Sequence, residues 1–120
     1  MLQSKAVRAY QALNKLASLP MPAQTAHALY KLRKALEPQW EFQAERDQAI
    51  VGSLGAQVGP DGTVEFRQPV DRVKFAEQIA ALAKMDVDVP FARVSVRLAD
   101  LSAPLTMDDL AALEEFVEVE

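Results

Sequence analysis

Few residues of this 120-residue sequence have the chemistry that catalysis requires, because it holds one histidine and no cysteine. A hydrolytic triad or an acid–base pair needs convergent groups of tuned pKa, most often with a histidine among them. His27 stands alone, and the residues three and four positions later are Tyr30 and Lys31 rather than acids. Without cysteine there is no thiolate nucleophile, zinc finger or disulfide. We interpret His27 as a structural or surface residue.

Two pairs of carboxylates are the next candidates for chemistry. Glu41 and Glu45 are one helical turn apart, and Asp86 and Asp88 would share one face of a strand. Either pair has the hard oxygen ligands of a cation site, but no second ligand cluster with the spacing of a calcium loop accompanies it. Phosphate-loop spacing is equally missing from the glycines at positions 52, 55, 59 and 62. The sequence predicts a protein that is not an enzyme and needs no metal or cofactor.

The charges are strongly segregated along the chain. Residues 1–36 hold six basic residues and no acidic one, whereas residues 99–120 hold seven acidic residues and no basic one. Complementary potentials of this kind act mainly on specificity and on the rate of association. We therefore predict that the acidic segment contacts the basic helices, within the chain or between copies; the alternative is two independently solvated faces. The candidate interaction surface consists of Lys31, Arg33, Lys34, Glu114, Glu115 and Glu118.

Nucleic acid is not an expected partner. The net charge is −4, and binding to phosphate backbones relies on many lysine and arginine contacts. The run Lys31, Arg33 and Lys34, next to Tyr30, would be the natural binding patch. On a helix, however, these three cations spread around the axis instead of forming a stripe.

Helical spacing dominates the first half of the sequence. Apolar residues recur at three- and four-residue steps over residues 4–18, with Ser4 as the expected cap, and again from Pro22 to residue 54. Pro38 lies inside the second pattern, where it removes a hydrogen bond and crowds the preceding turn, so we expect a kink. These two segments are predicted to form an antiparallel helical hairpin that ends at Gly55.

Short elements follow in the second half. The turn at residues 59–62 predicts a β-hairpin over 56–67, and residues 69–84 read as a helix that Asp71 caps. Residues 87–98 alternate in two phases, so one strand there requires a bulge or bend near Pro90. Thr106 is the expected cap of a last helix to about residue 115, before a tail that alternates like a strand. The prediction is an α+β fold: a kinked N-terminal α-hairpin packed on a small, mostly antiparallel sheet built from 56–67 and 87–98, with additional short helices.

The organisation predicted is one domain spanning residues 1–120. No repeat, low-complexity tract or flexible linker divides the sequence, and its composition is ordinary for a globular protein. The sequence has no uninterrupted apolar stretch, so neither a secretory signal nor a membrane span is predicted. Together with the lack of cysteine, this favours the cytoplasm.

The order of several short motifs resembles a family of small phage and prophage proteins of unknown function. The motifs are LNKL at 13–16, LPMPA at 19–23, AHALYK at 26–31 and ALEP at 35–38, followed by an acidic C-terminal helix. Pro38 departs from the smoother charged helix of that pattern. The resemblance implies a phage or prophage context in a bacterial host cell, and it transfers no catalytic residue.

Two functional hypotheses follow from these features. In the first, the protein is a non-enzymatic interaction or assembly protein that self-associates or binds another protein. In the second, it is a small acidic inhibitor that occupies a basic site on a host nucleic-acid-binding enzyme or defence system. An inhibitor would be monomeric with one broad acidic face, so sizing at low and high salt distinguishes the two.

Overall fold

The first helix is the centre of the fold. In the computed structural model, which describes residues 1–102 and 104–120, α1 spans Gln3–Leu16 and contacts α2, α3 and α4. Seven of its 14 residues are buried, and three of those are alanines that let neighbouring backbones approach closely. The predicted bounds of 4–18 are nearly right. Ser4 is not the cap, because Leu2 precedes the helix and no side chain caps it.

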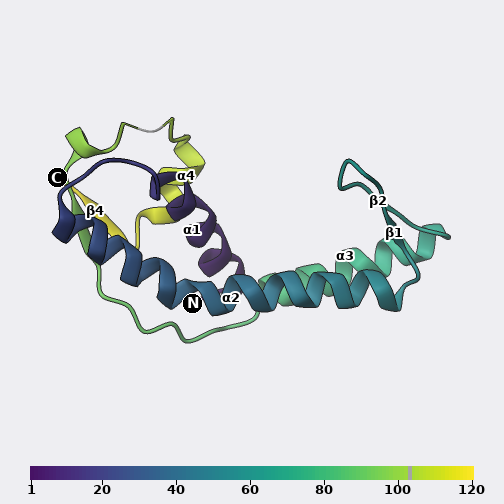
Figure 1. Cartoon of the computed structure of the whole chain (residues 1–120). Coiled ribbons are helices and arrows are strands. Elements are labelled where there is room, and N and C mark those ends of the chain that lie inside the picture. Colours follow the sequence, from purple (N-terminus) through teal and green to yellow (C-terminus); the bar gives the residue numbers. More distant parts are fainter. Residues whose placement is uncertain (103) are drawn as a thin grey trace.

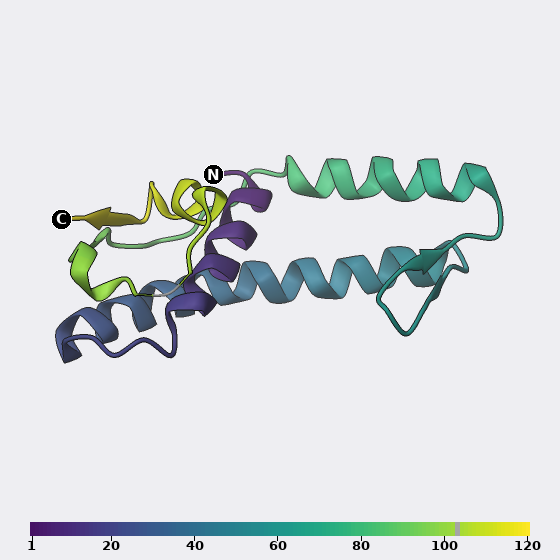
Figure 2. The same cartoon turned by 90° about the horizontal axis from the view of Figure 1, so that it is seen from above.

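The second helix is one continuous element, α2 at Ala23–Ser53, and Pro38 lies inside it. Its 31 residues give a length of about 47 Å. The axis changes direction near its middle in both Figure 1 and Figure 2, which is the expected consequence of a proline within a helix. The helix ends where predicted, because Gly55 takes the left-handed conformation with φ 64°.

The predicted antiparallel hairpin of the first two helices forms along the first half of α2, whereas the second half of α2 extends beyond α1. Tyr10 of α1 stacks on Trp40 of α2 at 5.4 Å between ring centres, and in Figure 1 α1 and the first half of α2 slope the same way. The neighbour that runs antiparallel to the second half of α2 is α3, at Pro69–Ala83 (Figure 2). This third helix was predicted almost to the residue, but Gln68 precedes it and Asp71 lies within its first turn rather than capping it.

The predicted single sheet is wrong, because the strands form two separate pairs. At one end of the molecule β1 (Gln57–Val58) pairs antiparallel with β2 (Val64–Glu65), as the hairpin prediction required. At the other end β3 (Val94–Val96) pairs in parallel with β4 (Val117–Val119). Segment 56–67 therefore never meets 87–98, since the length of the second helix separates them (Figure 1).

Only the second alternation phase of residues 87–98 forms a strand. Val94 and Val96 are buried in β3, and Val89 is also buried although it belongs to the opposite phase. An irregular segment around Pro90 takes up the change of face that the sequence required. A short 3₁₀ helix, η1 (Leu98–Asp100), follows, and α4 spans Met107–Leu113 with Thr106 as its cap, as predicted.

The chain forms a packed head and a projecting arm. We define the arm as residues 41–85 and the head as residues 1–40 with 86–120. The Cα radius of gyration is 16.8 Å, against about 13.6 Å for a compact domain of this length. The buried residues of the hydrophobic core cluster all lie in the head: Ala6, Ala9, Tyr10, Ala12, Leu13, Leu16, Leu29, Leu32, Leu36, Val89, Val94, Val96, Leu113, Phe116 and Val117.

Gln3 joins the head to the arm. Its side chain is fully buried, and its Nε2 donates a hydrogen bond of 2.8 Å to the backbone oxygen of Gln39 in α2. Its backbone N–H donates to the oxygen of Met85, just after α3, also at 2.8 Å. The start of the first helix is thereby bonded to the middle of the second and to the end of the third.

Shortening Leu36 tests where the stability of the fold lies. Leu36 is 0% exposed in the head, whereas Val58 is 59% exposed on the hairpin of the arm. We expect Leu36→Ala to lower the free energy of unfolding by about 2 to 5 kcal/mol, from lost burial and the cavity left behind. The matched Val58→Ala should change it by only about 0.5 kcal/mol. Urea unfolding followed by circular dichroism measures both, and equal losses would contradict a core confined to the head.

Candidate functional site

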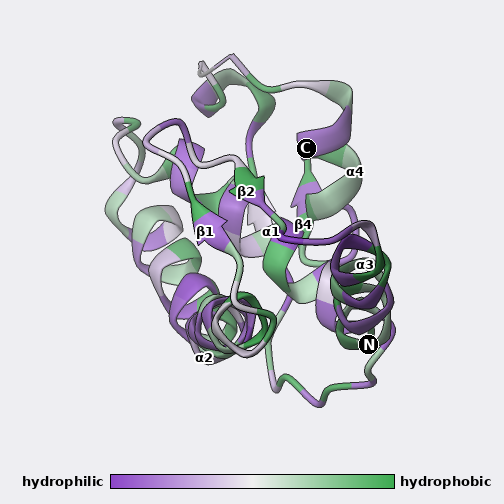
Figure 3. Ribbon diagram, turned by 90° about the vertical axis from the view of Figure 1, so that its right-hand side faces the viewer, coloured by the Kyte–Doolittle hydropathy of each residue, from purple (hydrophilic) through white to green (hydrophobic). Residues whose placement is uncertain are grey.

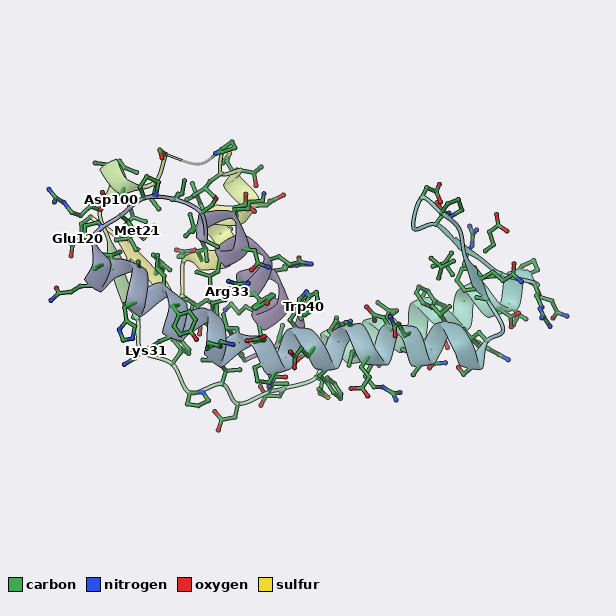
Figure 4. All side chains as sticks on the ribbon, in the orientation of Figure 1. Met21, Lys31, Arg33, Trp40, Asp100 and Glu120 are labelled. Carbon is green, nitrogen blue, oxygen red and sulfur yellow. The ribbon has the colours of Figure 1, made fainter. Side chains whose placement is uncertain are left out.

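The three predicted basic residues of the interaction surface lie in different surroundings on the second helix. Lys31 is exposed and points away from the head (Figure 4). Arg33 is half-buried, with its guanidinium 5.6 Å from the centre of the Tyr10 ring. Lys34 pairs with Glu37 on its own helix at 3.1 Å, a contact that raises the pKa of Lys34. They do not make one cationic stripe, in line with the expected spread around the helix.

Of the acidic half of the predicted surface, Glu115 contacts the first helix rather than the second. Glu115 pairs with Lys5 at 2.6 Å, while Glu114 accepts a hydrogen bond from Arg93 through its backbone oxygen at 3.1 Å. Glu118 is exposed on β4. The structure therefore does not join the acidic residues to Lys31, Arg33 and Lys34.

A second ion pair, which the sequence prediction did not name, joins α1 to α4. The ammonium of Lys15 donates to Oδ2 of Asp109 at 2.6 Å. Asp109 also completes the capping box of α4: its carboxylate accepts from the Thr106 backbone N–H at 2.9 Å, and its own N–H donates to the Thr106 hydroxyl at 3.1 Å. The predicted contact between basic and acidic ends thus exists within one chain, between α1 and α4.

The pKa of Asp109 follows from these partners. The hydrogen bond from Lys15 and, after it, the backbone hydrogen bond from Thr106 hold the pKa of this carboxyl below its usual value. Both favour the ionised form. The contact is therefore complete above the ordinary carboxyl pKa of about 3.9, and it is lost as the pH falls through the lowered value in the folded protein.

A groove lies beside this contact, between the first helix, the segment 87–91 and the fourth helix. Its volume is about 1050 Å³, and its walls carry charges of both signs: Lys5, Arg8, Asp88, Asp108, Asp109 and Glu115. The rest of the lining consists of residues with uncharged side chains: Met1, Leu2, Ser4, Gln11, Val87, Val89, Phe91, Ala111 and Ala112. Because cations and carboxylates alternate there, the groove selects neither anions nor cations.

The residues that the sequence analysis weighed for catalysis or metal binding lie on different segments. His27, Glu41 and Glu45 are exposed on α2, whereas Asp86 and Asp88 are exposed after α3. Among residues 1–102 and 104–120, no group of three or more histidine or acidic residues is placed to hold a metal ion. The same part of the chain contains no helix long and apolar enough to cross a membrane.

The feature that sequence reasoning missed is the unburied arm. Within residues 41–85, all of them described, only Ile50 and Leu82 are buried hydrophobic residues. Exposed large hydrophobic side chains on the same segment are Phe42, Val58, Val70, Val73 and Met85. Figure 3, which looks along the arm towards the head, shows green hydrophobic stretches on α2 and α3 between hydrophilic ones.

A signal for the arm was present in the spacing of its apolar residues. Phe75, Ile79 and Leu82 fall on one side of the third helix at steps of three and four. Val70 and Val73 fall on a different side, because each residue advances about 100° around the axis. Two apolar sides on one helix indicate two packing partners, and among the described residues none buries the side of Val70 and Val73.

The chain has no match among known proteins in any of the three comparisons: no family model, no curated protein and no solved structure matches it. The resemblance to small phage proteins stays a prediction. Any functional conclusion must come from the surfaces described above.

A pH titration tests the electrostatic account of Asp109. We expect its carboxyl to titrate below the usual value. Lys15→Gln should raise the midpoint, because the group that stabilises the carboxylate most is then lost. Carbon-detected NMR of the side-chain carboxyls measures the midpoints. The control is Lys31→Gln, on the opposite part of the head. A midpoint that Lys15→Gln leaves in place would contradict the contact.

Exchanging the charges of Lys5 and Glu115 tests the other ion pair. Both side chains are about half exposed, so we expect each of Lys5→Glu and Glu115→Lys to lower the free energy of unfolding by about 0 to 1 kcal/mol. The double variant should recover part of that loss. At 1 M salt the coupling should vanish, because the Debye length falls to about 3 Å. A coupling energy indistinguishable from zero at low salt would show two independently solvated faces.

Proposed function

We propose that this chain is a non-enzymatic protein–protein interaction or assembly protein, and that it binds its partner through the arm. The observation that carries the proposal is the unequal burial of the two parts. The head holds the whole core cluster, whereas the arm buries Ile50 and Leu82 alone. Helices of the arm's length are marginal unless an apolar face is packed, so a partner that covers the arm is the natural completion of the fold.

The charges of the arm support a protein partner over nucleic acid. Its 45 residues carry seven acids and five bases, and a phosphate backbone requires a cationic surface. Within the described residues, none of these charges forms an ion pair inside the chain. Mixed, unpaired charges around apolar side chains are typical of the polar rim of a protein interface.

The acidic-inhibitor hypothesis stays the second candidate. In its favour, several C-terminal acids are exposed, among them Glu114 and Glu118. Against it, Lys5 and Lys15 neutralise Glu115 and Asp109, so the acidic segment is not one free anionic face. The phage or prophage setting and the cytoplasm of a bacterial host are kept as parts of the proposal, on the strength of the resemblance.

Site-specific photo-cross-linking in the cells that make the protein tests the proposal. A photoreactive amino acid in place of Val73, on the arm, should capture a protein under irradiation, either a second copy or another chain. The same amino acid in place of Met107, which is 87% exposed on the head, is the matched control and should capture none. Capture from Met107 but not from Val73 would overturn the arm as the binding surface.

A further inference from the structure

We infer that the partner of the arm is a second copy of this chain, and that two arms pack antiparallel, the base of each against the tip of the other. The inference rests on the proposed function, because it names the partner of the surface proposed there. Two helices that lie antiparallel can bury one seam between them, and the second side of each is covered when two such pairs form a four-helix bundle. A second copy supplies the matching pair of helices.

The exposed apolar residues are distributed so that both ends of the arm need a cover. Val70 and Val73, at the tip, are 49% and 55% exposed. Phe42 and Met85, at the base, are each 37% exposed. An antiparallel pairing places the tip of one copy on the base of the other, so that each apolar end meets an apolar end. One two-fold contact then covers both ends on both copies, as an isologous interface requires.

Charge complementarity sets the direction. The base of the arm, residues 41–47 with 84 and 85, carries three acids and two bases: Glu41, Glu45 and Asp47 against Arg46 and Lys84. The start of the third helix and the residues before it, 66–74, carry three bases and one acid: Arg67, Arg72, Lys74 and Asp71. Antiparallel arms bring the acidic base of one copy to the basic tip of the other, whereas parallel arms oppose like charges at both ends.

The remaining acids near the tip do not cancel this difference. Asp61 and Glu65 belong to the hairpin of β1 and β2, which rises away from the axis of the arm (Figure 1). Figure 2 shows the second and third helices extending side by side from the head, with their outer sides uncovered by any other helix.

Light scattering of the purified full chain is the first test. We expect a mass of twice 13.2 kDa, with dissociation favoured at high salt because the end-to-end charge contacts are screened. The double variant Val70→Glu/Val73→Glu should be monomeric at concentrations where the parent is dimeric. Position 70 lies in the first turn of α3, where an acid favours the helix, and position 73 is 55% exposed in the next turn. We therefore expect the variant to keep its fold, which circular dichroism checks.

The matched control makes the same change in the head. Met107→Glu/Leu110→Glu also places two acids near the start of a helix, at positions that are 87% and 46% exposed. This control should remain dimeric. A monomeric parent, an open series of larger oligomers, or a dimer that only the head variant dissociates would each overturn the inference.

Spin labels give the direction of the arms, because the chain has no cysteine to interfere. Gln48→Cys places a label near the middle of the arm, and Gln68→Cys places one at its tip. Antiparallel arms make the distance between the two tip labels longer than that between the two middle labels. Tip labels as close together as the middle labels would overturn the antiparallel arrangement.

Failure of the inference is distinguishable from failure of the proposed function. A monomer in light scattering, combined with capture of a different protein from position 73 in cells, removes the second copy and keeps the arm as the interaction surface. A monomer without any capture at position 73 overturns both the second copy as the partner and the arm as the interaction surface.

Discussion

The arrangement of this protein depends on the buried end of the first helix. Gln3 is fully buried, yet it is polar, and its two hydrogen bonds go to Gln39 in the second helix and to Met85 after the third. The bond to Gln39 comes from the side-chain Nε2 and the bond to Met85 from the backbone N–H, while the side-chain Oε1 is buried without a hydrogen-bond partner among the described residues. Directional bonds of this kind allow few arrangements of the groups around them. The alanines that follow, Ala6 and Ala9, are 0% exposed and let the other helices pack closely. The direction in which the arm leaves the head is therefore set by a handful of contacts around one helix turn.

Some of the segregated charges form ion pairs with one another inside the head. Two lysines of the first helix meet two acids at the fourth, and one of those acids also closes the capping box with Thr106. Exposed ion pairs of this kind contribute little to the free energy of folding. Their effect is on orientation, since they favour one placement of the fourth helix and thereby bring β4 beside β3. The basic residues of the second helix have no share in this contact.

A packed head with a thinly buried arm connects the fold to the proposed function. The buried core cluster lies within the head. The arm has exposed valines, unpaired charges of both signs and a length set by the uninterrupted second helix. Binding a partner removes more apolar area from water at the arm than at the head, because little of the arm's apolar area is buried within the chain. An elongated shape and an interaction surface are two consequences of the same distribution of apolar residues.

The sequence by itself determined the local elements, and the reason is that their signals act between near neighbours in the chain. Capping at Thr106, left-handed glycines at Gly55 and Gly62, and apolar spacing placed the helices, the hairpin and most of their ends. The charge segregation likewise predicted a contact between the first helix and the acidic end, although not the pairing of Lys15 with Asp109. What only the tertiary structure decided was which surfaces meet. The parallel pairing of β3 with β4, the packing of α3 along the second half of α2 and the separation of the two sheets depend on residues far apart in the sequence. Val70 and Val73 read as core positions in the sequence because periodicity shows that a side is apolar, but not whether anything in the same chain covers it.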